Sequence, residues 1–141
     1  MATDYIALSE LKTFIGYTGS GQDDNLNMAI DAGSRAIDDY CGRFFHQTAL
    51  QTRTYDCEFP DFAPVDDIST TTGLVIKSLQ SDGTVDTTYT INTDFFLHPQ
   101  NAANETPVMP YNKIVMALVN SGKLLPTGHR KGLSVYAKFG F

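Results

Sequence analysis

Residues 23–42 read DDNLNMAIDAGSRAIDDYCG and carry the strongest periodic signal in the chain. Apolar and small residues recur there at spacings of three and four, which predicts an amphipathic helix from Asp23 to Tyr40 or Cys41. The acidic start suits the positive end of a helix dipole, and Gly42 suits the left-handed end of a helix. The stripe expected to be buried comprises Leu26, Ala29, Ile30, Gly33, Ala36, Ile37, Tyr40 and Cys41.

A second face of the same predicted helix is charged. It contains Asp31, Arg35, Asp38 and Asp39. The simpler interpretation is a solvated face. The alternative is a subunit interface or a channel-lining face, because neighbours in a ring need complementary charges.

A short helix is expected before this one, from Ser9 to Phe14. Ser9 is the expected N-cap, since its hydroxyl can accept a hydrogen bond from the first turn. Gly16 is expected to end the helix.

From Leu50 onward the pattern changes to a period of two, which indicates half-buried β-strands. Asp82-Gly83 is a strong hairpin signal, and Pro60 and Pro64 are expected to end the first strand. The strands are expected near residues 50–59, 74–79, 87–91, 95–97, 112–118 and 133–139. Two long loops are expected at residues 99–110 and 120–132.

Together these elements predict an α+β fold, with one short and one long amphipathic helix followed by an antiparallel sheet or sandwich of about six short strands. The 141 residues suit a single domain, with a helical part at 1–45 and a β-rich part at 50–141.

The charge of −6 excludes a generally basic nucleic-acid binder. Residues 1–72 carry a net charge of −8 and residues 73–141 a net charge of +2. No apolar run has the roughly 18 residues of a membrane span, and the start shows no secretory signal. We therefore expect that the protein does not associate with a membrane and that it is made in a cytoplasm. In that compartment Cys41 and Cys57 would stay reduced, as buried structural thiols.

The sequence shows no constellation typical of an enzyme, and we expect no catalytic residue and no cofactor. His46, His98 and His129 lack metal-ligand spacing, so no metal is expected either. The Asp-Asp pairs are explained by helix capping and solvation.

The one basic cluster lies in the loop at 120–132 and contains Lys123, His129, Arg130 and Lys131. It is a candidate partner-contact loop. A solvated loop, contact with DNA phosphates and contact with an acidic patch on a protein all remain open.

Three segments resemble one family: Leu8-Ser9-Glu10-Leu11-Lys12, the stretch SRAIDDYCGRFF at 34–45, and Arg53-Thr54-Tyr55-Asp56. Residues 107–116, Leu125-Pro126 and LSVYAKFG at 133–140 continue the likeness. In these segments the chain resembles the head–tail connector, or adaptor, proteins in the neck of tailed bacteriophages, in their longer form with a β-rich insert.

The resemblance implies a structural protein that forms a ring, usually dodecameric, joining the portal protein to the next neck or tail-completion protein. Genomic DNA would pass through its channel without sequence-specific binding. The resemblance places the protein in the virion neck, after assembly in the host bacterial cytoplasm. An acidic channel wall would let DNA slide, so the acidic N-terminal half is expected nearer the channel.

Members of the family usually continue past the final Phe-Gly-aromatic into a further helix, whereas this chain ends at Phe141. If no such helix follows, the contact that it makes with the long helix has to come from elsewhere, for example from a neighbouring subunit.

Two other functions remain open. A monomeric module that binds a ligand or host factor would use aromatic side chains of the sheet as a groove, although strand alternation places them in the core first. These are Tyr55, Phe59, Tyr89, Phe95 and Phe96. A small hydrolase is the third possibility.

Overall fold

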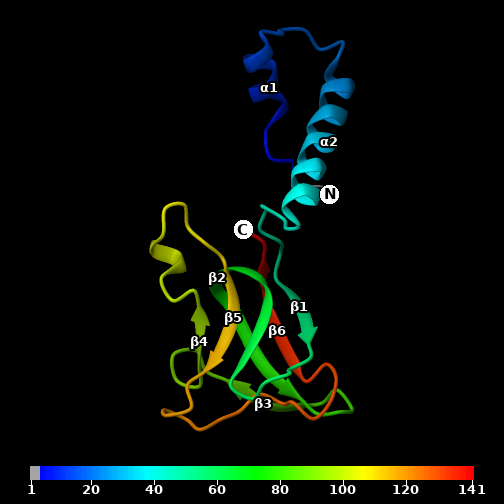
Figure 1. The fold of residues 1–141 in the computed structure, drawn as a ribbon. Coiled ribbons are helices and arrows are strands. Elements are labelled where there is room, and N and C mark those ends of the chain that lie inside the picture. Colours follow the sequence, from blue (N-terminus) through cyan, green and yellow to red (C-terminus); the bar gives the residue numbers. More distant parts are fainter. Residues whose placement is uncertain (1–3) are drawn as a thin grey trace. The chain divides into compact units, whose positions relative to one another are not determined.

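The computed structural model describes residues 4–141, and the chain divides into two compact units. The helical unit ends at His46, and the β unit spans Gln47–Phe141. The predicted α+β fold is confirmed: a short helix and then a long one precede a six-stranded antiparallel sheet (Figure 1). The sheet is a single one, so the alternative of a sandwich does not apply.

The long helix, α2, spans Asp23–Cys41, which confirms both predicted ends. Gly42 follows with φ of 64°, and its N–H donates to the carbonyl oxygen of Asp38 at 2.8 Å. This left-handed residue satisfies one of the carbonyl groups that a helix end leaves unpaired.

The short helix, α1, spans Leu8–Ile15 and ends at Gly16, as predicted. Its predicted cap is wrong. The N-cap is Ala7, whose N–H donates to the side chain of Glu10 at 2.7 Å, and Ser9 lies inside the helix. The Glu10 side chain, at the third helical position, accepts from the N–H of the N-cap residue itself, which is the donor that the acidic half of a capping box satisfies.

The β unit has the strand order β1-β6-β2-β5-β4, and β3 also pairs with β2. The strands are β1 (Gln51–Tyr55), β2 (Phe62–Leu79), β3 (Val85–Tyr89), β4 (Phe95–His98), β5 (Tyr111–Met116) and β6 (Leu133–Phe139). The predicted bounds of β6 are confirmed, and those of β3, β4 and β5 are shifted by one or two residues. The strand β1 is half as long as predicted.

The largest difference from the prediction is β2, which begins at Phe62 rather than Leu74 and contains Pro64. Its first part pairs with β5, and its second part pairs with β6 and β3. The register shifts between Pro64 and Ile68, so the proline lies at an irregular point of the ladder, where its missing N–H is tolerated. In Figure 1 this strand curves through the middle of the sheet.

The predicted hairpin at Asp82-Gly83 is confirmed and joins β2 to β3. Gly83 has φ of 86°, and the N–H of Gln80 donates to the carbonyl of Thr84 at 2.8 Å. The loop at 99–110 contains a short 3₁₀-helix at Ala102–Asn104, and its Ala102 is buried.

The hydrophobic core lies in the β unit and joins apolar side chains from β2, β4, β5 and β6. Its largest buried members are Phe95, Phe139, Ile68, Ile76, Ile114, Leu133 and Val135. In contrast, Ile30 is the one apolar residue below 9% exposure among the described residues of the helical unit.

Candidate partner-binding surfaces

Tyr5 connects the N-terminal segment to α2 and to the residues that follow it. Its hydroxyl donates to the Asp38 carboxylate and accepts a hydrogen bond from the N–H of Phe45 at 3.0 Å. Its own N–H donates to Ser34 Oγ at 3.2 Å. The Arg35 guanidinium lies 5.9 Å from the centre of the Tyr5 ring. Burial and the Asp38 hydrogen bond raise the pKa of Tyr5, which keeps its hydroxyl protonated as a donor.

The four charges predicted to share a face of α2 do not form one exposed patch. Asp31 and Asp39 are exposed. Asp38 is only 5% exposed, and its carboxylate lies 3.3 Å from Nε of Arg35. The expectation that Asp38 faces solvent, a partner or a channel is therefore wrong, because the N-terminal segment covers it.

The predicted apolar stripe of α2 is also mostly uncovered, which corrects its expected burial. The face that α2 buries is Ile30, Ser34 and Asp38, spaced by four residues. At about 100° per residue this face is turned by roughly a quarter circle from the apolar stripe. The segment containing Tyr5 and α1 thus covers only one edge of the stripe.

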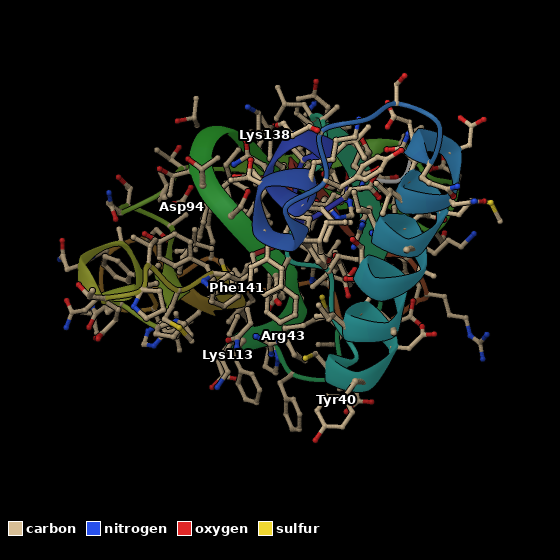
Figure 2. The ribbon with its side chains drawn as sticks, turned by 90° about the horizontal axis from the view of Figure 1, so that it is seen from above. Tyr40, Arg43, Asp94, Lys113, Lys138 and Phe141 are labelled. Atoms are coloured by element: carbon tan, nitrogen blue, oxygen red, sulfur yellow. The ribbon has the colours of Figure 1, made fainter. Side chains whose placement is uncertain are left out.

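We call the uncovered part the α2 strip; it comprises Ala29, Gly33, Ala36, Ile37 and Tyr40. Tyr40 is 93% exposed and Ile37 is 47% exposed. Figure 2 shows the Tyr40 side chain pointing away from the helix. A Cβ added at Gly33 would meet no atom within 4 Å, so the middle of the strip is open space.

The predicted partner-contact residues lie in the segment at 118–131, which we call the basal loop. Lys123 is bound: its Nζ lies 2.7 Å from Oδ2 of Asp94, a carboxylate that is 2% exposed. The hydrogen bond from Lys123 holds the pKa of Asp94 below its usual range. This lysine therefore anchors the loop to the sheet rather than forming a free cationic site.

The other three predicted residues lie further along the basal loop. His129 Nε2 is 2.6 Å from the carbonyl oxygen of Leu79, which accepts the hydrogen bond. Arg130 and Lys131 are exposed, and the N–H of Lys131 donates to Asp56 at 2.6 Å. The loop thus presents two cationic side chains to solvent on a backbone that is tied to the β unit.

Apolar side chains accompany these charges on the basal loop. Val119 is fully exposed, and Leu118 and Leu124 are about half exposed. The carbonyl of Leu124 accepts a hydrogen bond from Tyr89 at 2.8 Å, which fixes this part of the loop against the core. In Figure 1 the loop runs along the end of the β unit where β3 lies.

The aromatic residues considered as a ligand groove do not line one face. Tyr89 and Phe95 are buried in the core, and Tyr55 and Phe96 are half-buried. Phe59 is exposed but stacks on Phe62, with ring centroids 4.7 Å apart. The core position expected from strand alternation is confirmed for Tyr89 and Phe95, and the groove of the alternative function is not formed by these five side chains.

Among residues 4–141, no group of three or more His, Cys, Asp or Glu side chains is arranged to hold a metal ion. Both cysteines are free. Cys57 is buried as expected, whereas Cys41 is exposed, which corrects its prediction because α2 leaves that side uncovered. Burial raises the pKa of the Cys57 thiol to about 11.

In the part of the chain that the structure describes, no helix is long and apolar enough to cross a membrane. Comparison of the sequence and the structure with protein-family models, curated proteins and solved structures finds no match.

Sequence reasoning missed Tyr5 and Ser34. Ile30, Ser34 and Asp38 are spaced by four residues and therefore lie on one face of α2. Because Ser34 and Asp38 are polar, their residue types do not indicate that this face is buried. Only the hydrogen-bond partners supplied by the N-terminal segment make their burial favourable.

Proposed function

We propose that this chain is a structural protein of the neck of a tailed bacteriophage. Copies would associate in a ring that joins the portal vertex of the head to the next neck or tail-completion protein. The ring would extend the channel for genomic DNA without reading its sequence. In this proposal the protein belongs to the virion and performs no catalysis.

One observation carries the proposal: the helical unit leaves the α2 strip without cover. Helices gain little stability in water from their backbone alone, and most of their stability in proteins comes from tertiary burial. Among the described residues, this unit buries one apolar side chain below 9%, Ile30. An assembly in which another chain covers the strip supplies the missing burial.

The positions of the elements also support the proposal. The segments that resemble the adaptor family fall on α1, on the second half of α2, on β1 and on β6. The aromatic and Gly-Arg signature at 40–45 lies at the end of α2, where Tyr40 is exposed and Phe45 contacts Tyr5.

The charge distribution agrees with a DNA channel. Asp31 is an exposed carboxylate, and DNA phosphates would be repelled by a wall that carries it. Asp38 does not contribute, since its carboxylate is occupied by Tyr5.

The test is sedimentation velocity of the purified protein, alone and mixed with the portal ring of the same phage. We expect the protein to join the portal complex. Ile37→Asp should abolish this joining, because it places a charge in the α2 strip. Val85→Asp is the matched control, since Val85 is an equally exposed apolar residue on β3.

A wild-type protein that stays monomeric and ignores the portal would contradict the proposal and favour a ligand-binding module. Equal loss of joining in both variants would contradict the role assigned to the α2 strip.

A further inference from the structure

We infer that the α2 strip of one copy binds the basal loop of the next copy, so that chains associate head to tail. The inference rests on the proposed function, in that it names the partner of the surface on which that function depends. The occupant of the α2 strip is a second copy of this chain.

The first argument is charge. Exposed Asp39 lies beside the strip, whereas the segment at 118–131 exposes Arg130 and Lys131 and contains no acidic residue. Asp39 borders the strip, being three residues beyond Ala36 on the helix. The exposed cations Arg130 and Lys131 have the sign needed to meet it.

The second argument is the match between apolar surfaces. The middle of the strip is lined by Ala29, Gly33 and Ala36, whose small side chains leave room for a larger side chain from outside. The basal loop offers the exposed side chains of Val119 and Leu124 next to its charges. Each surface therefore combines apolar area with one sign of charge.

The third argument is symmetry. Two α2 strips facing each other would bring two acidic helices together, which like charges disfavour. A contact between two different surfaces is heterologous, and repetition of such a contact generates a ring when the rotation closes. The pairing of strip with loop is heterologous, which is the type of contact that a ring repeats.

The first experiment is a zero-length carbodiimide cross-link on an equal mixture of ¹⁵N-labelled and unlabelled protein at high concentration. We expect a peptide pair joining Asp39 to Lys131 with mixed isotopes, read by mass spectrometry. A pair with one isotope only would show that the chain's own loop occupies the strip and would overturn the inference. Absence of the pair would overturn it as well.

The second experiment exchanges the charges. Asp39→Arg and Arg130→Glu should each weaken self-association by about tenfold, read by sedimentation velocity at the same high concentration. Combining both substitutions in one chain should restore it. Asp31→Arg is the control, because it makes the same change on the side of α2 away from the strip. Failure of the double variant to recover would overturn the inference, as would an equal loss in the control.

The two proposals fail separately. A protein that joins the portal but shows no strip-to-loop cross-link keeps the proposed function and loses this interface. If the protein forms the cross-link but does not bind the portal ring, the interface is supported and the proposed neck function is contradicted.

Discussion

The hydroxyl of Tyr5 donates a hydrogen bond to the carboxylate of Asp38, 33 residues later in the chain. The same oxygen accepts the N–H of Phe45. One side chain thus ties the start of the helical unit to the end of α2 and to the segment that follows it. It also removes from solvent a carboxylate that the sequence places on a charged face.

Tyr5→Phe should destabilise the helical unit by about 1–3 kcal/mol, because it removes a hydrogen bond to a buried charged group. Hydrogen exchange of the α2 amides measures this directly. Tyr40→Phe removes the same atom from a side chain that is 93% exposed and should leave exchange unchanged. Equal protection in both variants would show that the Tyr5 contact contributes nothing.

Gly132→Ala should lower the free energy of unfolding of the β unit by about 1–3 kcal/mol, since overpacking forces neighbours to move. A Cβ there would lie 2.9 Å from Cγ of Pro126 and 3.1 Å from its carbonyl oxygen. Gly128→Ala is the matched substitution in the same loop, where a Cβ meets nothing within 4 Å. Urea denaturation of the two variants should separate them, and identical midpoints would refute the steric argument.

Stability should fall as the pH rises above 9, because the folded state binds the Cys57 proton more tightly than the unfolded state does. The pKa of this thiol is raised from 9.0 to about 11, mainly by burial. The stability present below pH 9 is therefore lost between pH 9 and 11, with a slope of at most about 1.4 kcal/mol per pH unit.

Denaturation curves between pH 8 and 9 test the onset of this slope, because Tyr5, Tyr55 and Tyr89, whose pKa is also raised from 10.0, add their own contribution at higher pH. Cys57→Ala should flatten the curve, whereas Cys41→Ala, which changes an exposed thiol, should retain it. If the free energy of unfolding of Cys57→Ala still falls with pH at the wild-type slope, another titrating group causes the pH dependence.

Lys123→Met should destabilise the β unit at neutral pH, because it leaves the Asp94 carboxylate buried without its cation. The pKa of Asp94 is lowered from 3.8 in the folded protein, so the stability it contributes is present above that pH and is lost as the pH falls. The difference in free energy of unfolding between wild type and Lys123→Met should therefore become smaller as the pH falls towards the pKa of Asp94. Lys77→Met, on β2, is the control. If the difference in free energy of unfolding between Lys123→Met and wild type does not change with pH, the ion pair does not contribute to stability.

Local signals in the sequence determined α2, β6 and the β2–β3 hairpin. The helix has a clear three-and-four period between an acidic start and a glycine end. The last strand alternates strictly, with Leu133, Val135, Ala137 and Phe139 all buried. Elements of this kind are specified by their own side chains, so their bounds were predicted within one or two residues.

The first half of β2 was decided only by the tertiary structure. Residues 62–73 contain a proline and a run of threonines without apolar alternation. They become a strand because β5 and β6 supply hydrogen-bond partners on either side. Strand pairing is a contact between distant segments, and no local pattern reports it.

The face that α2 buries was decided in the same way. The helical periodicity of residues 23–41 was enough to show that α2 is amphipathic and that its charges lie apart from its apolar stripe. The tertiary structure decided that Tyr5 covers Ser34 and Asp38 while the stripe stays open. The physical reason is that a buried polar group is stable only beside its hydrogen-bond partner, and that partner lies in a different part of the chain.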